Sequence, residues 1–265
     1  ARETQAPQVS GAFNIVGKEM KGAQVAGVFN VTGKNVMGTQ LAGVFNLAGK
    51  TVKGSQLAGV FNFAGKEVKG AQLAGVLNVA SKVRGTQIGV LNIADSVNGV
   101  PIGFLSFVWK GYHKIELSAD EVFYHNVAFR TGVRQFYNIV TAAARPSSYK
   151  DDETIWAFGY GVGTAPRLSR KLFLNFDITA NQIVKGNTIE AVNLLNKVYI
   201  GFDYQLFKQL SLTFGGTING YVTDNNHDGY FPLFTDYQPN IFYERNFRNH
   251  NLKMWFGAKV GVRFL

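Results

Sequence analysis

One short segment carries residues that could bind a metal ion. The run Asp224-Asn-Asn226-His-Asp228-Gly229 matches the first half of a calcium loop, in which side-chain oxygens converge on a hard cation. Thr235 stands where the second half would supply a bidentate glutamate. A polar turn rich in Asn, Asp and Gly can form from the same residues for local backbone reasons. We therefore expect a polar turn or a calcium site at Asp224, Asn226 and Asp228, and no other cofactor.

The remaining reactive residues form no recognisable catalytic pattern. The four histidines, His113, His125, His227 and His250, have neither metal-ligand spacing nor a serine or cysteine partner in a motif. The chain has no cysteine, which excludes thiol redox chemistry and disulfide bonds. The glycines recur with a repeat and do not form a nucleotide-binding loop. The sequence therefore predicts a protein that is not an enzyme.

Regularly spaced lysines could bind an anion. They are Lys18, Lys34, Lys50, Lys66 and Lys82, with a neighbouring row of Lys21, Lys53, Lys69 and Arg84. Like charges on stacked strands repel, so these side chains either splay into water or neutralise an anion such as a lipid or polymer phosphate. The simpler interpretation is a solvated edge that discourages aggregation.

These lysines belong to a repeat, of which KGSQLAGVFNFAGKEV (53–68) is one unit. A period this short predicts a β-solenoid in which each repeat forms one coil. The eight-residue halves of a unit are too short for membrane hairpins, whose strands need about 9–11 residues each. We therefore assign residues 1–110 to a β-solenoid repeat domain.

Amide residues recur in step with the repeat. Stacked about 4.7–4.8 Å apart, they should form structural ladders between coils, in preference to a ligand site. The ladder members are Gln24, Gln40, Gln56 and Gln72, and Asn30, Asn46, Asn62 and Asn78. Both strand faces also carry apolar residues, Leu57, Phe61 and Phe63 against Ala58, Val60 and Ala64. Periodicity leaves open which face fills the core, and the other face would be an interaction surface.

From residue 111 the repeat gives way to longer alternating segments. In 251–264, every second residue from Leu252 to Phe264 is apolar, which is typical of a strand with one apolar face. No apolar run approaches the roughly 20 residues of a spanning helix. Strands are expected near 111–120, 121–132, 134–146, 154–166, 171–185, 194–206, 209–223 and 251–265. The predicted fold is all-β, an N-terminal β-solenoid of about 16-residue coils followed by an eight-stranded antiparallel transmembrane β-barrel over residues 111–265.

An eight-stranded barrel encloses a space just wide enough for side chains. Charged residues of both signs fall on the predicted inward positions, where pairing avoids isolated buried charge. We therefore expect a plug of ion pairs and no conducting pore. The expected members are Glu116, Asp120, Arg130, Asp177, Asp203, Lys253, Lys259 and Arg263.

The net charge of +10 raises the question of a nucleic-acid partner. The basic residues are periodic and are not clustered with base-stacking aromatic residues. The sequence therefore predicts no nucleic-acid binding.

The stretch GTQIGVLNIADSVNGVPIGFLSFVWKGYHKIELSADEVF (85–123) resembles bacterial surface-repeat proteins with G-x-Q-x-G-x-x-N repeats, notably outer-membrane members from Bacteroidetes. In those proteins the repeats run into a segment similar to GYHKIELSADEVFYHNVAFRTGVRQFYNI (111–139) and then a barrel. The resemblance implies an outer-membrane protein and supplies no catalytic residues.

The sequence thus predicts a non-enzymatic protein of the bacterial outer membrane. Its barrel would contact membrane lipid, and its repeat domain would act as a scaffold or accessory subunit through contacts with other outer-membrane or periplasmic proteins. The short connections at 165–171 and 207–210 are typical of periplasmic turns and place the solenoid in the periplasm. The alternatives are a surface adhesin, an anion- or lipopolysaccharide-binding protein, and a lipid-modifying enzyme with a serine–histidine pair at the outer rim.

Overall fold

The computed structural model describes residues 2–145, 154–185, 189, 193–224 and 239–264. The regular elements within these ranges are β-strands, so the all-β prediction is confirmed. No helix in the described part of the chain is long and apolar enough to cross a membrane. The chain divides into two compact units, Ala1–Tyr112 with Thr131–Asn138, and His113–Arg130 with Ile139–Leu265.

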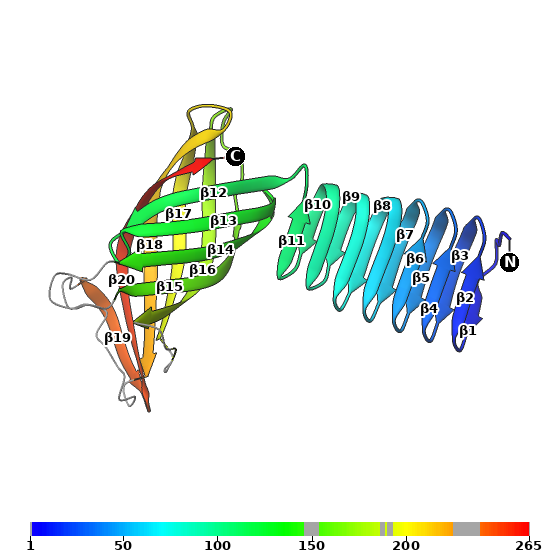
Figure 1. The fold of residues 1–265 in the computed structure, drawn as a ribbon, viewed down its shortest axis with the longest axis horizontal. Helices are drawn as coiled ribbons and strands as arrows, with labels where there is room; N and C mark the ends of the chain where they lie inside the picture. The colour runs from blue at the N-terminus through cyan, green and yellow to red at the C-terminus, as the bar shows by residue number, and fades with distance from the viewer. Residues whose placement is uncertain (1, 146–153, 186–188, 190–192, 225–238, 265) are drawn as a thin grey trace. The chain divides into compact units, whose positions relative to one another are not determined.

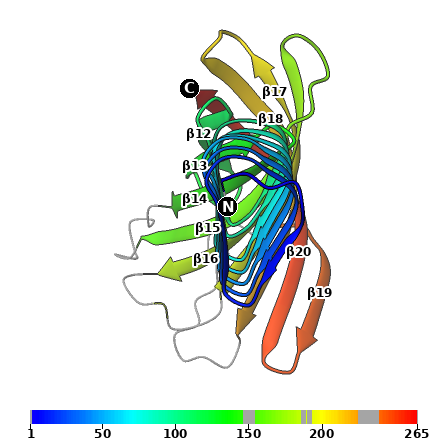
Figure 2. The same ribbon diagram turned by 90° about the vertical axis from the view of Figure 1, so that its right-hand side faces the viewer.

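The first unit is the predicted β-solenoid, whose stacked coils are shown in Figure 1. One face consists of short parallel strands, β2 (Phe13–Val16), β4 (Phe29–Thr32), β6 (Phe45–Ala48) and β11 (Leu105–Val108). The other face holds the three-residue β1 (Gln8–Ser10) and the longer strands β3 (Met20–Ala26), β5 (Val36–Ala42) and β7 (Val52–Ala58). β8 (Phe61–Ala74), β9 (Leu77–Ile88) and β10 (Leu91–Ile102) each pass through both faces. Seen along the stack, the coils superpose into a flattened section (Figure 2).

Parallel pairing aligns equivalent repeat positions in neighbouring coils. Phe29 pairs with Phe45, and Phe45 pairs with Phe61, which is the predicted spacing of 16 residues. The last coils are shorter, since Leu91 pairs with both Leu77 and Leu105, each 14 residues away.

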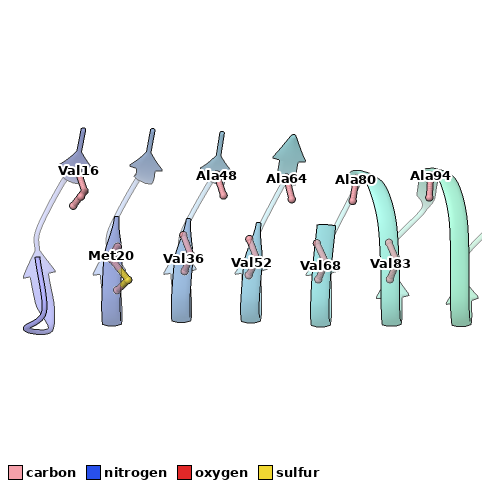
Figure 3. Packing of buried hydrophobic residues seen from close by; sticks show 10 residues of the cluster. All are labelled: Val16, Met20, Val36, Ala48, Val52, Ala64, Val68, Ala80, Val83 and Ala94. Carbon is pink, nitrogen blue, oxygen red and sulfur yellow. The ribbon is translucent and has the colours of Figure 1, made fainter. Parts of the chain in front are cut away.

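The solenoid core is narrow and is filled by small apolar residues (Figure 3). Its buried members are Val16, Met20, Val36, Ala48, Val52, Ala64, Val68, Ala80, Val83 and Ala94. The larger Leu57, Phe61 and Phe63 point outward and are partly exposed. Val60, which the sequence groups with Ala64, is 42% exposed because it lies in the bend between β7 and β8, where the alternation loses its phase.

A glycine bends each long strand. Gly54 has a φ of 136°, in the region that residues with a side chain rarely adopt. A Cβ atom at this position would also collide with the carbonyl oxygen of Gly38 in the preceding coil. The same positive φ recurs at the equivalent positions, Gly22, Gly38, Gly70, Gly85 and Gly99. Glycine is therefore required at this repeat position by both backbone conformation and close stacking.

The segment 131–138 closes the last coil of the solenoid. Asn138 Nδ2 donates a hydrogen bond to Gly103 O at 2.8 Å, and its Oδ1 accepts one from Ser106 N at 2.8 Å. Thr131 Oγ1 donates to Ser106 O at 3.1 Å. These bonds satisfy Gly103 O and the N–H and C=O groups of Ser106 in β11, the last short strand, which would otherwise form a bare sheet edge.

The second unit is the predicted closed eight-stranded antiparallel barrel. Its closure comes from pairing of the first strand with the last, from Ile115 opposite Phe264 to Asp120 opposite Lys259. In chain order the barrel strands are β12 (Tyr112–Asp120), β13 (His125–Val133), β14 (Phe136–Arg145), β15 (Ile155–Thr164), β16 (Leu172–Lys185), β17 (Asn193–Gln205), β18 (Leu210–Asp224) and β20 (His250–Phe264).

The barrel strands alternate as their sequences predict. On β16 and β18, Asn175, Asp177 and Thr213 are buried in the interior, whereas Phe176 and Phe214 are exposed. The exposed side chains form the outer surface of a single sheet, and no second layer of described residues covers them within this unit. The barrel is therefore apolar outside, and its interior combines polar and charged residues with a buried apolar cluster that includes Ile183, Leu195 and Trp255.

Two local details differ from the predicted strands. Residues 121–124 form a turn and do not begin β13, because Asp120 Oδ1 accepts hydrogen bonds from the backbone N–H groups of Val122 and Phe123. The long connection between the last two barrel strands contains an additional strand, β19 (Ile241–Phe247), which pairs with the first half of β20.

Candidate functional site

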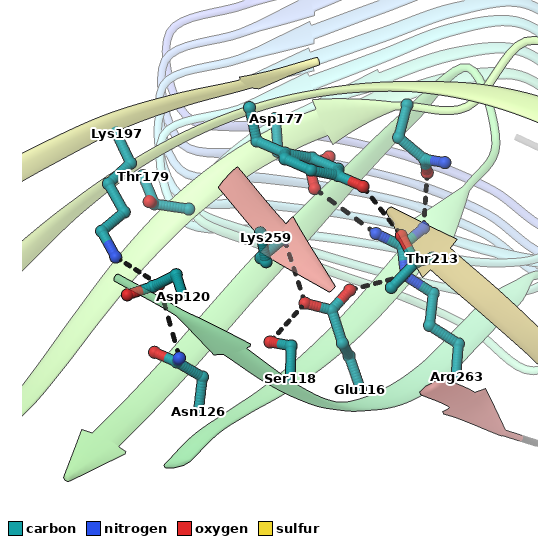
Figure 4. A network of polar contacts seen from close by, with 12 residues as sticks. Glu116, Ser118, Asp120, Asn126, Asp177, Thr179, Lys197, Thr213, Lys259 and Arg263 are labelled. Atoms are coloured by element: carbon teal, nitrogen blue, oxygen red, sulfur yellow. Dashed lines mark hydrogen bonds and ion pairs between the residues drawn. The ribbon is translucent and has the colours of Figure 1, made fainter. Parts of the chain in front are cut away.

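A network of paired charges occupies the barrel interior (Figure 4). Glu116 lies at its centre, with its carboxylate 2.9 Å from Arg130 Nη1, 3.0 Å from Lys259 Nζ and 2.6 Å from Arg263 Nε. We call Glu116, Asp177, Asp203, Arg130, Lys259 and Arg263 the ionic network. Five strands supply its three carboxylates and three cations, so the ionic network carries no net charge when all six groups are ionised.

The other members of the ionic network complete it. Asp177 Oδ2 is 2.9 Å from Arg130 Nη2 and 3.7 Å from Arg263 Nη2. Asp203 Oδ2 is 3.5 Å from Arg263 Nη1, which also donates a hydrogen bond to Asn175 Oδ1 at 2.6 Å. Both arginine side chains are 1% exposed or less, so most of their compensation comes from these partners.

A second ion pair lies further along the barrel. Lys197 Nζ donates to Asp120 Oδ2, and the other oxygen of this carboxylate holds the 121–124 turn. Asn126 Nδ2 also donates to Asp120 Oδ2, at 3.4 Å. Lys197 is in phase with the predicted inward residue Asp203, so its place could have been found from the alternation of β17.

A third polar cluster was not foreseen from the sequence. Glu121 accepts hydrogen bonds from Trp255 Nε1 at 3.1 Å, Asn219 Nδ2 at 2.7 Å and Ala258 N at 3.0 Å. Glu121 follows Asp120 in a turn, where alternation makes no prediction about side-chain direction. Its contacts depend on the closure of the barrel, which brings β18 and β20 to the end of β12.

The interior retains a cavity of about 50 Å³ beside these charges, lined by Glu116, Asp120, Arg130, Asp177, Lys197 and Lys259 among others. A cavity of this size has room for a few water molecules. Ligand pockets are usually larger, at roughly 300–1,000 Å³. The arrangement therefore suits a plug of paired charges better than a substrate pocket.

Two of the sequence-derived candidates lie away from the ionic network. Lys253 Nζ is 3.7 Å from Glu244 on β19, and both side chains are partly exposed. Asp224 ends β18, whereas Asn226 and Asp228 lie outside the described residues. Within the described ranges, no group of three or more histidine, aspartate or glutamate residues is arranged to hold a metal ion.

Two amide ladders run through the solenoid. Each asparagine donates to the asparagine of the next coil, as from Asn30 to Asn46 at 2.9 Å and from Asn46 to Asn62 at 3.0 Å. Each glutamine donates to the preceding coil, as from Gln56 to Gln40 at 2.9 Å. The predicted structural ladders are thus present, and their donor directions oppose each other. The same geometry continues through Gln24, Gln72 and Asn78.

The ladders end differently. Asn92 Nδ2 donates to Ser106 Oγ at 3.2 Å, so a serine continues the asparagine ladder. Gln87 donates to Gln72 at 2.8 Å, but the next position is Pro101, and the buried Gln87 Oε1 has no donor among the described residues. The glutamine ladder therefore stops at Gln87.

The predicted anion-binding lysines are only partly in one row. Backbone hydrogen bonds stack Lys34 on Lys18, Lys50 on Lys34 and Lys66 on Lys50, with N–O distances of 2.8–3.0 Å. Lys18 also lies 3.6 Å from Glu3. Lys82 is opposite Glu67 and not opposite Lys66, because the register shifts between Ala64 and Glu67. Lys18, Lys34, Lys50 and Lys66 therefore form one row, and Lys82 lies one strand position away from that row.

No protein-family model, curated protein sequence or solved structure matches this chain. The fold and its interior define the class of protein, a β-solenoid with amide ladders joined to a closed eight-stranded barrel filled by side chains.

Proposed function

We propose that this protein is a non-enzymatic component of a bacterial outer membrane, of the Bacteroidetes surface-repeat type that its sequence resembles. In this proposal the barrel is the membrane anchor, and the solenoid is a scaffold or accessory subunit that binds other outer-membrane or periplasmic proteins. An apolar outer surface around an interior that contains paired charges supports the anchoring role.

The phenylalanine row of the solenoid carries the proposal of a protein partner. Its members, Phe13, Phe29, Phe45 and Phe61, stack with ring centroids 4.9–5.2 Å apart and planes within 14° of parallel. Exposed valines of the adjoining bends extend this surface, including Val44 at 38% and Val60 at 42% exposure. A contiguous apolar surface of this kind on a folded domain is typical of an interface.

The connectivity of the barrel supports a periplasmic solenoid. The connections at the rim where β12 begins and β20 ends, 134–135, 165–171 and 206–209, have two to seven residues, whereas those at the opposite rim have four to 25 and include the two longest, 146–154 and 225–249. In outer-membrane barrels the short turns face the periplasm. The repeat chain enters the barrel at this same rim, so it would approach from the periplasm.

The partner role is tested by adding charge to the phenylalanine row. Phe29→Glu with Phe61→Glu places the two carboxylates two coils apart, which limits their mutual repulsion. We expect the variant to lose proteins that co-purify with the unmodified chain after crosslinking in cells. The matched control, Thr39→Glu with Asn98→Glu, adds the same charge at exposed positions of the other face and should retain them. Equal recovery with both variants would refute the role of the row.

Membrane anchoring has its own test. Unboiled, detergent-extracted protein should migrate faster in a denaturing gel than boiled protein, because a closed barrel resists unfolding. Protein that remains soluble without detergent and shows no shift would exclude the membrane anchor, whatever the result for the phenylalanine row.

A further inference from the structure

The long-strand face of the solenoid carries a concentrated positive charge in its central coils. We call Lys50, Lys53, Lys66, Lys69, Lys82 and Arg84 the cationic patch. Lys53, Lys69 and Arg84 occupy the same strand position in three successive coils, and Lys50 and Lys66 stack in the preceding bend. Residues 50–84 include only one acidic residue, Glu67.

The cationic patch is electrostatically unfavourable by itself. Like charges directly opposite each other on adjacent strands destabilise a sheet. Glu67 offsets part of the repulsion, since its carboxylate lies 2.8 Å from Arg84 Nε and 3.5 Å from Lys69 Nζ. The other cations in the patch exceed what one carboxylate can balance. Departures from locally favourable chemistry are expected at functional sites.

An apolar groove of about 370 Å³ lies on the same face. One side of this groove is formed by Leu41, Leu57, Leu73 and Ile88, one residue from each of four coils, and the rest by alanines and glycines at the following bends. We call it the leucine groove. The groove is shallow and open to solvent, so a molecule bound in it would lie along the face.

The cationic patch and the leucine groove adjoin along each strand. On β7, Lys53 and Leu57 both point outward, and four residues of extended chain place them at most about 13 Å apart. Small residues fill the interval, namely Ser55, Ala71 and Thr86 in successive coils. Along each of these strands the cationic patch is therefore followed by a small residue and then by the leucine groove. No bulky side chain separates the patch from the groove.

We propose that this face binds an anionic lipid, with its phosphate on the cationic patch and an acyl chain in the leucine groove. Charge complementarity selects the headgroup, and the adjoining groove distinguishes a lipid from a free phosphate. The site goes beyond the proposed protein contacts, which use the phenylalanine row on the opposite face. Binding would place an anion where the lysines and arginine otherwise repel one another.

Because the chain has no cysteine, a single introduced cysteine can be labelled at a chosen position. Ser55→Cys, labelled with an environment-sensitive fluorophore, reports on the boundary between the cationic patch and the leucine groove. The full chain in a neutral maltoside detergent is titrated with dihexanoylphosphatidylglycerol, dihexanoylphosphatidylcholine and inorganic phosphate. We expect a saturable blue shift with phosphatidylglycerol at a concentration about tenfold lower than with phosphatidylcholine, because exposed charge pairs contribute modestly. Inorganic phosphate should cause no blue shift.

Variants in the labelled protein assign the two halves of the site. Lys53→Gln, Lys69→Gln and Arg84→Gln together should raise the phosphatidylglycerol midpoint about tenfold and leave that of phosphatidylcholine unchanged. Arg170→Gln, Lys171→Gln and Lys208→Gln together remove the same charge from barrel turns and should change neither midpoint. Leu57→Ser with Leu73→Ser should weaken the binding of both lipids.

A salt titration tests the proposal on the labelled Ser55→Cys protein alone. It does not depend on whether the Gln and Ser variants fold correctly. Raising the salt concentration should weaken phosphatidylglycerol binding selectively, because screening acts on the charged headgroup. Equal midpoints for the two lipids, a blue shift with phosphate alone, or no saturable response would overturn the proposal. Equal loss in the patch variant and the turn control would also overturn it, because net charge alone would then explain the binding.

Discussion

The solenoid and the barrel both bury polar side chains between strands, but the chemistry of their interiors differs. The solenoid uses neutral amides at the same repeat positions, and each amide bonds to its equivalents in adjacent coils and to nearby backbone carbonyls. The barrel uses charged residues that occur once each, and Glu116 alone contacts three cations. The buried polar groups of the solenoid are therefore spread over successive coils, whereas those of the barrel's ionic network converge on Glu116.

This difference predicts how each interior responds to the loss of one side chain. A ladder loses its local bonds while more distant coils retain theirs, as expected for a nearly one-dimensional array. The ionic network loses its charge balance, and an uncompensated buried charge is more costly than a lost neutral hydrogen bond. Single substitutions can test this ranking.

The largest effect is expected for Glu116→Gln. The substitution leaves three buried cations facing two carboxylates and should cost about 3–5 kcal/mol of stability. Urea unfolding of the barrel in detergent, followed by tryptophan fluorescence, measures the loss. Glu244→Gln is the matched control, because its exposed pair with Lys253 should contribute at most about 1 kcal/mol. Similar losses for the two substitutions would contradict the special position of Glu116.

A second substitution sharpens this test. Lys259→Met added to Glu116→Gln restores equal numbers of buried cations and carboxylates in the ionic network. The double variant should therefore recover part of the stability lost by Glu116→Gln, and the same unfolding measurement on Lys259→Met alone completes the cycle that gives the coupling. Additive losses would show that charge balance does not control this interior.

Within the solenoid, Gly54→Ala should have the largest effect, about 2–4 kcal/mol. The alanine would combine an unfavourable backbone conformation with a collision against Gly38 of the preceding coil. Hydrogen exchange of β5, β7 and β8 should increase. A Cβ at Gly11 meets no atom within 4 Å, so Gly11→Ala should leave exchange nearly unchanged.

Asn46→Ala should cost about 2 kcal/mol, since it leaves buried groups without partners. Asn46 accepts from Asn30 and donates to Asn62 and to Leu57 O. Local hydrogen exchange should rise in the coils that contain β4, β6 and β8, and distant coils should remain protected. Asn98→Ala, at an exposed position, is the control. Uniform loss of protection along the solenoid would show that the ladder acts as a unit.

The smallest effect is expected at the end of a ladder. Gln87→Met should cost about 1 kcal/mol, because it removes the bond to Gln72 while Gln87 Oε1 already lacks a donor among the described residues. Gln56→Met interrupts bonds to Gln40 and Gln72 and should cost more. Equal urea midpoints would contradict the difference between the middle and the end of the ladder.

The repeat made the solenoid and its ladders predictable, but not the direction of every side chain. A period of 16 residues brings identical amides together regardless of coil shape. The inward set depends on core width, because the space between the two faces admits Val52 and Ala64 but not Phe61. Lys82 was misplaced for a related reason, since one bend is a residue shorter and shifts the strand register.

The alternation of apolar residues made the barrel and most of its inward charges predictable. Glu116, Arg130, Asp177, Asp203, Lys259 and Arg263 lie on regular strands, where side-chain direction follows from parity. Lys253 has inward parity, but β19 provides it with Glu244 outside the ionic network. Glu121 could not be assigned because a turn breaks the parity and its partners come from strands almost 100 residues or more away.

The opposed donor directions of the amide ladders have a consequence for how the repeat domain can change in length. Each coil from that of Gln24 to that of Gln72 receives and gives one side-chain amide bond in each direction, so these coils present equivalent surfaces to their neighbours. Loss or duplication of one 16-residue unit by in-frame recombination would therefore join matching surfaces. Such changes in the gene would lengthen or shorten the solenoid by whole coils and leave the barrel sequence unchanged.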